Sequence, residues 1–157
     1  MPEYRITEDA LERREVLDLL ELHLAEAHAL SPPSKVHAMP AERLRQGDVT
    51  FYSAWDGKAL AAVGALREIE PRRGELKSMR SSTAYRGKGA GEAILRHLVA
   101  EAQRRGYTWI GLETGRAAAF EPARTLYRKL GFAECEAFGA YVSDAFSLCM
   151  SRELAPA

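Results

Sequence analysis

The chain has 157 residues, of which 46% are hydrophobic, which is enough for one globular domain whose core needs no metal or disulfide. It carries 22 Lys plus Arg and 22 Asp plus Glu, so its formal net charge is zero. Because no overall field attracts nucleic acid or an anionic membrane, we expect neither as a partner. We therefore predict a single domain over residues 1–157.

The sequence also indicates a cytoplasmic location. The N-terminus lacks a charged segment followed by an apolar one, and no apolar run approaches the roughly 20 residues that span a bilayer. Cys135 and Cys149 form no Cys-x-x-Cys pair, and no histidine stands at metal-ligand spacing. We expect reduced thiols and no metal, although the sequence leaves open whether the two cysteines ever pair.

The first half of the sequence is predicted to form a short strand, two helices and a hairpin. After a strand at 4–7 comes a helix whose apolar face comprises Leu11, Leu17, Leu20, Leu22, Leu24 and Ala27. Pro32 and Pro33 end this helix, and a short one follows at 39–46. Residues 49–55 and 58–66 then predict a β-hairpin, because the intervening Asp-Gly suits a tight turn.

The second half predicts a β-turn-α-β unit with parallel strands. Its strands are expected at 75–80 and 107–112, and its helix at 92–103, where apolar residues recur at helical spacing. A further helix is predicted at 117–130, with Gly131 just past its end. A closing pair of strands begins at Phe132, and the last strand is expected at about 145–150.

A glycine turn connects the strand at 75–80 to the helix at 92–103, where residues 86–91 read Arg-Gly-Lys-Gly-Ala-Gly. Glycines let a ligand approach the backbone, and the first N–H groups of the helix point out of its positive end, which favours phosphate. The dinucleotide fingerprint needs a glycine where Glu92 stands. The P-loop needs Ser or Thr after Lys88, where Gly89 stands.

The turn instead matches Arg-x-x-Gly-x-Gly, and there the chain resembles the Gcn5-related N-acetyltransferases, whose acetyl-CoA pyrophosphate sits on this turn. The order β-α-α-β-β-β-α-β-α-β-β is similar to that of the family over nearly the whole chain. The resemblance implies an α/β (α+β) fold with a mixed, mostly antiparallel sheet of six to seven strands and about four flanking helices. It also implies that strands four and five splay apart near Met79 and Leu112, with the pantetheine arm in the gap.

The resemblance implies specific cofactor contacts. Backbone N–H groups around Ser78 and Met79 would bond the pantetheine or the acetyl carbonyl. The pyrophosphate would lie on the turn, and the cofactor-binding residues implied there are Arg86, Gly87, Lys88, Gly89, Ala90 and Gly91. Thr114 and Ala123 are expected to contact the cofactor as well.

Acetyl transfer to an amine needs a neutral amine, a stabilised carbonyl oxygen and a proton for the departing thiolate. Tyr127 lies in a segment, 123–132, that resembles the family's segment carrying a tyrosine next to the cofactor sulfur, so we expect it to be the general acid. Glu75 and Glu113 are candidate bases, because they begin and end strands on the two sides of the cleft. Many family members carry an asparagine near the end of the fifth strand, where this chain has Glu113-Thr114-Gly115.

Substrate choice in this family depends largely on the first two helices and the late hairpin. The expected substrate-binding residues are His28, Ser31, His37 and Arg124, which suit a small amine that bears a carboxylate. Residues 30–39, 113–115, 120–124 and 135–138 resemble a bacterial subgroup that includes one acetyltransferase linked by name to auxin metabolism.

We therefore expect an acetyl-CoA-dependent N-acetyltransferase that acts on the primary amine of a small molecule by direct transfer in a ternary complex. Two alternatives stay open: a protein N-terminal or lysine acetyltransferase, and a non-catalytic acyl-CoA-binding sensor. A homodimer is the default expectation for its assembly.

Overall fold

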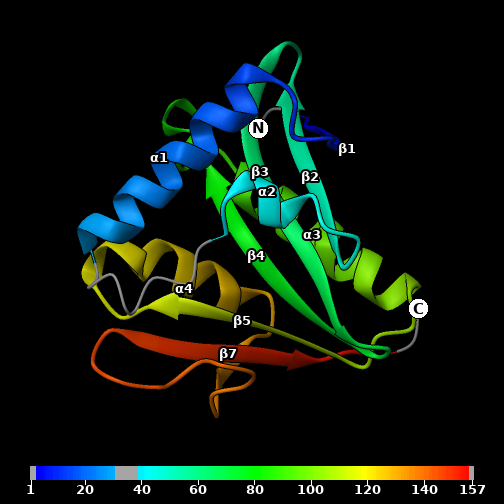
Figure 1. Ribbon diagram of the computed structural model, residues 1–157, viewed down its shortest axis with the longest axis vertical. Helices are drawn as coiled ribbons and strands as arrows, with labels where there is room; N and C mark the ends of the chain where they lie inside the picture. The colour runs from blue at the N-terminus through cyan, green and yellow to red at the C-terminus, as the bar shows by residue number, and fades with distance from the viewer. Residues whose placement is uncertain (1–2, 31–38, 156–157) are drawn as a thin grey trace.

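The computed structural model describes residues 3–30 and 39–155 and forms one seven-stranded sheet in the order β1-β2-β3-β4-β5-β7-β6 (Figure 1). Its strands are β1 (Arg5–Glu8), β2 (Val49–Asp56), β3 (Ala59–Glu70), β4 (Arg73–Ser81), β5 (Trp109–Gly115), β6 (Ala133–Cys135) and β7 (Ser147–Glu153). Its α-helices are α1 (Arg14–Leu30), α2 (Ala41–Leu44), α3 (Ala90–Arg104) and α4 (Glu121–Lys129). The predicted fold class and the order of elements are confirmed.

The sheet opens between β4 and β5, as predicted. These two strands are parallel, and their pairing runs from Arg73 with Trp109 to Glu75 with Gly111, where it ends. All other neighbouring strands are antiparallel. Beyond Glu75 the strands diverge, and this leaves a gap at their carboxyl ends (Figure 1).

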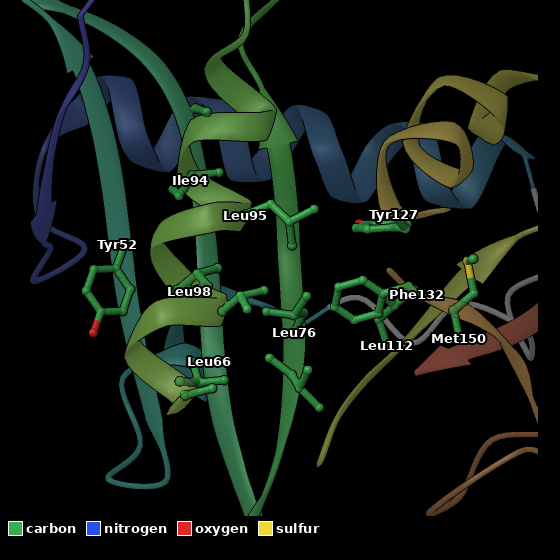
Figure 2. Close-up of a cluster of buried hydrophobic side chains, with 14 of the residues drawn as sticks. Tyr52, Leu66, Leu76, Ile94, Leu95, Leu98, Leu112, Tyr127, Phe132 and Met150 are labelled. Carbon is green, nitrogen blue, oxygen red and sulfur yellow. The ribbon is translucent and has the colours of Figure 1, made fainter. Parts of the chain in front are cut away.

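Two hydrophobic clusters hold the sheet, one on each face, because side chains alternate along a strand. α3 packs behind the sheet, where Leu98 joins the cluster that contains Leu66 and Leu76 (Figure 2). α1 and α2 pack in front, where Leu20 and Val63 belong to the second cluster (Figure 1). Within the described residues, no helix is long and apolar enough to cross a membrane.

The apolar face of α1 differs from the prediction. Val16, Leu19 and Leu20 are its buried residues, whereas Leu22 is 39% exposed. Successive helical residues rotate by about 100°, so Leu20 and Leu22 lie on nearly opposite sides and cannot both face the sheet. Leu11 is buried, but it lies before α1 with a φ of 61° and is not part of the helical face.

Three boundaries near the C-terminal half also differ. α4 begins at Glu121 rather than 117, after a short 3₁₀ turn (Ala118–Phe120), and has Pro122 in its first turn. β5 begins at Trp109 rather than 107. β7 covers 147–153 rather than 145–150, because the Asp144 carboxylate accepts the N–H groups of Phe146 and Ser147 and makes a turn there.

The two cysteines face each other across the last two strands. Cys135 of β6 lies directly opposite Cys149 of β7, and both are free thiols. Cys149 is buried, and its burial raises the pKa of the thiol, so it stays protonated at neutral pH.

Candidate active site

The β4–α3 turn is shaped by glycines with left-handed backbone conformations. Gly87 has a φ of 73°, and Gly89, the N-cap of α3, has a φ of 81°. A side chain is disfavoured at both positions. The backbone N–H groups of Gly87, Gly89, Ala90, Gly91 and Glu92 have no protein acceptor in the part of the chain that the structure describes. The turn therefore presents a set of unpaired donors at the positive end of a helix.

These donors border a cavity of about 780 Å³ that lies across the gap in the sheet. One wall comes from the turn, α3 and α4, and includes Ala123, Leu126 and Tyr127. β4 contributes Met79, Arg80 and Ser81. A further wall, the α1 wall, is the last part of α1, which contributes His23, Glu26 and Ala27. The cavity is thus bordered by the glycine turn and by the end of α1, and Arg86 of the turn lies 3.8 Å from Glu26 of α1.

A β-bulge in β4 lies beside this cavity. The pairing of β3 with β4 shifts between Val63 and Ala65, so that Ser78 and Met79 together lie opposite Gly64. Ser78 has a φ of 57°, and its buried Oγ has no hydrogen-bond partner among the described residues. A Cβ at Gly64 would approach the Met79 sulfur to 2.7 Å, so glycine makes room for the Met79 side chain. The bulge interrupts the β3–β4 hydrogen-bond ladder at Ser78 and Met79, next to the cavity wall.

Tyr127 closes the α4 side of the gap. It is 6% exposed, and its ring packs against Phe132, with 5.9 Å between ring centroids (Figure 2). Burial raises the pKa of the Tyr127 phenol, so the hydroxyl stays protonated across the physiological range. Because Tyr127 also lines the cavity, this hydroxyl is suited to donate a hydrogen bond or a proton.

The α1 wall carries a cluster of ionisable side chains. Arg80 Nη1 pairs with Glu26 Oε2 at 2.5 Å, and Arg86 Nη2 lies 3.8 Å from the same oxygen. The hydrogen bond from Arg80 lowers the pKa of Glu26. Burial, with a smaller contribution from Arg80, lowers the pKa of His23 to about 4, so His23 is neutral at pH 7.

Glu75 and Lys77 belong to a different, buried network on β4. Glu75 is 1% exposed and accepts a hydrogen bond from Arg67 at 3.3 Å and another from the Tyr141 hydroxyl. Lys77 donates to the Tyr141 hydroxyl at 2.6 Å, and burial lowers the pKa of Lys77. Glu75 does not line the cavity, and this arrangement favours a role in holding the 136–146 segment rather than contact with an amine. Glu113 does not line it either, although it is partly exposed.

Most of the predicted cofactor-binding residues meet at the cavity, and three do not line it. The residues that line it are Met79, Arg86, Gly87, Gly89, Ala90, Gly91 and Ala123. Lys88 is turned away, since its carbonyl accepts the Tyr4 hydroxyl and its ammonium lies over the Tyr85 ring. Thr114 is buried in β5, and Ser78 lies at the bulge.

The predicted substrate-binding residues do not form one group in the structure. Arg124 is buried, and its guanidinium bonds the carbonyl of Gly115 at 2.5 Å and the carboxylate of Glu121 at 2.6 Å, which favours a structural role. His28 is exposed and does not line the cavity, and Ser31 and His37 lie outside the described residues. Sequence reasoning missed Arg80 at this site, and it selected His28 rather than His23 and Glu26 on the same helix. Positions 23, 26 and 27 lie on one face of a helix, and this spacing could have shown that His23 and Glu26 point to the same side.

Comparison with known proteins agrees with this geometry. Residues 16–132 match the acetyltransferase (GNAT) family. The chain belongs to this family. The uncharacterized N-acetyltransferase YsnE of Bacillus subtilis (strain 168) is 45% identical over 146 residues, which are 93% of this chain and 97% of that protein. As a member of the family, the protein is an acyltransferase.

One further relative and one solved structure extend the comparison. The IAA acetyltransferase of Azospirillum brasilense is 31% identical over 155 residues, with 98% of this chain and all of that protein (100%) covered. A Bacillus subtilis acetyltransferase solved in complex with CoA shares the fold, with a TM-score of 0.72, 21% identity and coverage of 98% of this chain and 100% of that one. Among the described residues, no group of three or more His, Cys, Asp or Glu side chains is arranged to hold a metal ion.

Proposed function

We propose that this protein is an acetyl-CoA-dependent N-acetyltransferase that moves an acetyl group to the primary amine of a small molecule by direct transfer in a ternary complex. One observation carries the proposal: the unpaired N–H groups of the β4–α3 turn and the Tyr127 side chain line the same cavity across the split sheet. The turn is suited to the cofactor pyrophosphate, and Tyr127 is suited to the sulfur.

In this proposal the bulge and the turn position the donor. Backbone N–H groups of Gly87 and residues 89–92 hold the pyrophosphate, and backbone groups around Ser78 and Met79 hold the pantetheine and the acetyl carbonyl. The amine nitrogen bonds to the carbonyl carbon, the carbon–sulfur bond breaks, and the sulfur takes the Tyr127 proton. The proton lost by the amine leaves through a base or through water.

The two candidate bases, Glu75 and Glu113, differ in the exposure of their side chains. Glu75 is enclosed by Arg67, Lys77 and Tyr141, whereas Glu113 on β5 is partly exposed. We therefore favour Glu113, with water as its link to the cavity, and assign Glu75 to the support of Tyr141. A cytoplasmic location and a homodimer remain predictions from the sequence.

The test is a calorimetric titration of the protein with acetyl-CoA, followed by a panel of small primary amines assayed for coenzyme A release. Gly91→Glu is the blocking variant, because a side chain there would extend into the cavity near Ser81 Oγ, 3.2 Å from the new Cβ. Gly47→Glu is the matched control, since nothing lies within 4 Å of its Cβ position and it adds the same charge.

Binding by wild type and Gly47→Glu that is lost in Gly91→Glu, together with turnover of a small amine, would support the proposal. No binding by wild type would contradict it. Binding with turnover of peptides alone would favour the protein acetyltransferase, and binding without any turnover would favour the sensor.

A further inference from the structure

Arg80 occupies a special position in the cavity wall. It follows the bulge in β4, one residue after Met79, whose side chain lies on the α3 face near Leu98. Because side chains alternate along a strand, Arg80 points to the other face, where it meets Glu26 of α1. Arg80 therefore lines the cavity beside the last part of α1, and Arg86 of the turn lies near the same carboxylate of Glu26.

The donors of Arg80 are mostly unused. Its side chain is 13% exposed, and Nη1 pairs with Glu26 at 2.5 Å. Nε and Nη2 are buried and have no hydrogen-bond partner among the described residues. These two nitrogens share one edge of the guanidinium, where parallel N–H bonds match the two oxygens of a carboxylate. A buried donor without an acceptor is unusual and needs an explanation.

The other strongly buried cations in the described part of the chain differ from Arg80 in this respect. Lys77 donates to Tyr141, and Arg124 bonds Gly115, Ala117 and Glu121. Their donors hold segments of the fold together. Arg80 is therefore the cation of the cavity wall whose buried donors, Nε and Nη2, have spare capacity for an anion.

The local charge balance also leaves room for an anion. Arg80 and Arg86 share the single carboxylate of Glu26, whose side chain is 41% exposed. His23, the fourth ionisable group here, adds no charge at pH 7, since burial lowers its pKa to about 4. Two guanidinium groups facing one carboxylate give the wall a net positive charge.

We propose that Arg80 is the specificity residue of the acceptor site and binds the carboxylate of an amine acceptor, so that the substrate class is amino acids and related aminocarboxylates. This inference rests on the proposed function. Glu26 occupies Arg80 while the acceptor is absent. When the acceptor binds, its carboxylate displaces Glu26, which moves toward Arg86, and the freed guanidinium turns its Nε and Nη2 edge to the two carboxylate oxygens.

The test compares acids with their amides. Acetylation is measured for α-amino acids and β-alanine and for the carboxamide of each, with wild type, Arg80→Gln, Arg80→Lys and Glu26→Gln. Arg104→Gln is the matched control, because its guanidinium pairs with Glu101 on the exposed side of α3. Acetyl-CoA binding to each variant is measured separately by calorimetry, and acids that are not acetylated are titrated into protein saturated with coenzyme A.

We expect wild type to favour at least one acid over its amide by about 10- to 100-fold in kcat/KM, the range for hydrogen bonds to a charged group. Arg80→Gln should remove this preference by raising KM for the acid, while turnover of the amide stays within about threefold. Arg80→Lys should recover part of the preference, because an ammonium keeps the charge without the fork. Glu26→Gln should lower KM for the acid.

Three results would overturn the inference: no acid bound or acetylated, no preference for acid over amide in wild type, or equal losses for acid and amide in Arg80→Gln. Intact acetyl-CoA binding and turnover of other amines in these cases would leave the proposed function standing. Loss of acetyl-CoA binding by wild type would instead contradict the proposed function itself.

Discussion

The ring of Tyr127 is buried in the core, and the residue also lines the cavity. A change to phenylalanine keeps the ring and removes only the hydroxyl, so it tests the hydroxyl alone. We expect Tyr127→Phe to lower kcat by about 10²- to 10⁴-fold, the usual contribution of a general acid, with little change in acetyl-CoA affinity. Burial raises the pKa of the phenol, so its ionisation should cause no loss of rate up to pH 10. Steady-state kinetics from pH 6 to 10 check both statements.

Tyr107→Phe is the control for this prediction. Tyr107 is also buried, but its hydroxyl bonds Glu68 at 3.0 Å, and it does not line the cavity. Its kcat should match wild type. Equal activity of Tyr127→Phe and wild type would exclude Tyr127 as the acid.

His23 links the α1 wall to the pH dependence of stability. Burial lowers its pKa to about 4 in the folded state, below the value of about 6.5 for an unperturbed histidine. Between these two pH values the unfolded chain binds a proton that the folded protein excludes, so stability falls as the pH drops through this window. Above pH 6.5 His23 is neutral in both states, and this loss of stability is absent.

We therefore expect this residue to account for about 2 kcal/mol of the loss in unfolding free energy between pH 7 and 4.5. His23→Gln should lose that much less over the same range in urea titrations. His28→Gln, a change at an exposed histidine of the same helix, should behave like wild type. The same acid sensitivity in all three proteins would show that His23 does not titrate in this way.

At the scale of elements, α3 has a glycine with a left-handed backbone conformation at each end. The same substitution at the two glycines can therefore show whether the turn at the first end binds the cofactor. Gly89 at the N-cap has a φ of 81°, and Gly106 past the C-terminal end has a φ of 82°. An alanine at either position should cost about 1–2 kcal/mol of stability, because a Cβ is disfavoured in the left-handed conformation.

Gly89→Ala should also weaken acetyl-CoA binding, whereas Gly106→Ala should leave it unchanged. The reason is that the Gly89 conformation directs the N–H groups of the first helical turn, while Gly106 lies at the far end of α3. Thermal unfolding and calorimetry of the two variants separate these effects. Equal affinity in both variants would show that the turn does not hold the cofactor.

At the scale of the whole molecule, separate hydrophobic clusters cover the two faces of the split sheet. A ligand in the cavity would contact residues of α1, β4, α3 and α4 at once. Binding to the folded state alone stabilises a protein by about 2.7 kcal/mol at a ligand concentration of 100 times Kd. For a chain of this size, that corresponds to a rise in Tm of about 5–10 °C. Differential scanning calorimetry should show this rise with acetyl-CoA in wild type and its absence in Gly91→Glu.

Local features of the sequence were sufficient for the order of the elements and for the glycine turn. Asp56-Gly57 at the hairpin, Gly106 after α3 and the glycines at 87 and 89 act through backbone conformation, which neighbouring residues largely determine. The split between β4 and β5 and the placement of Tyr127 followed from a family resemblance rather than from periodicity. The predicted start of β7 was wrong because the Asp144 side chain accepts hydrogen bonds from the backbone of Phe146 and Ser147, which the pattern of residue types does not show.

The sequence by itself thus determined the order of elements and the glycine turn, because each depends on spacing along the chain, whereas the place of Tyr127 came from the family resemblance. The tertiary structure decided the surroundings of Arg80 and Glu75. Arg80 meets Glu26 because α1 passes beside the carboxyl end of β4 (Figure 1), and Glu75 is enclosed because Tyr141, 66 residues away, donates a hydrogen bond to it. Such pairings depend on how distant segments fold together, and no local pattern of residue types encodes them.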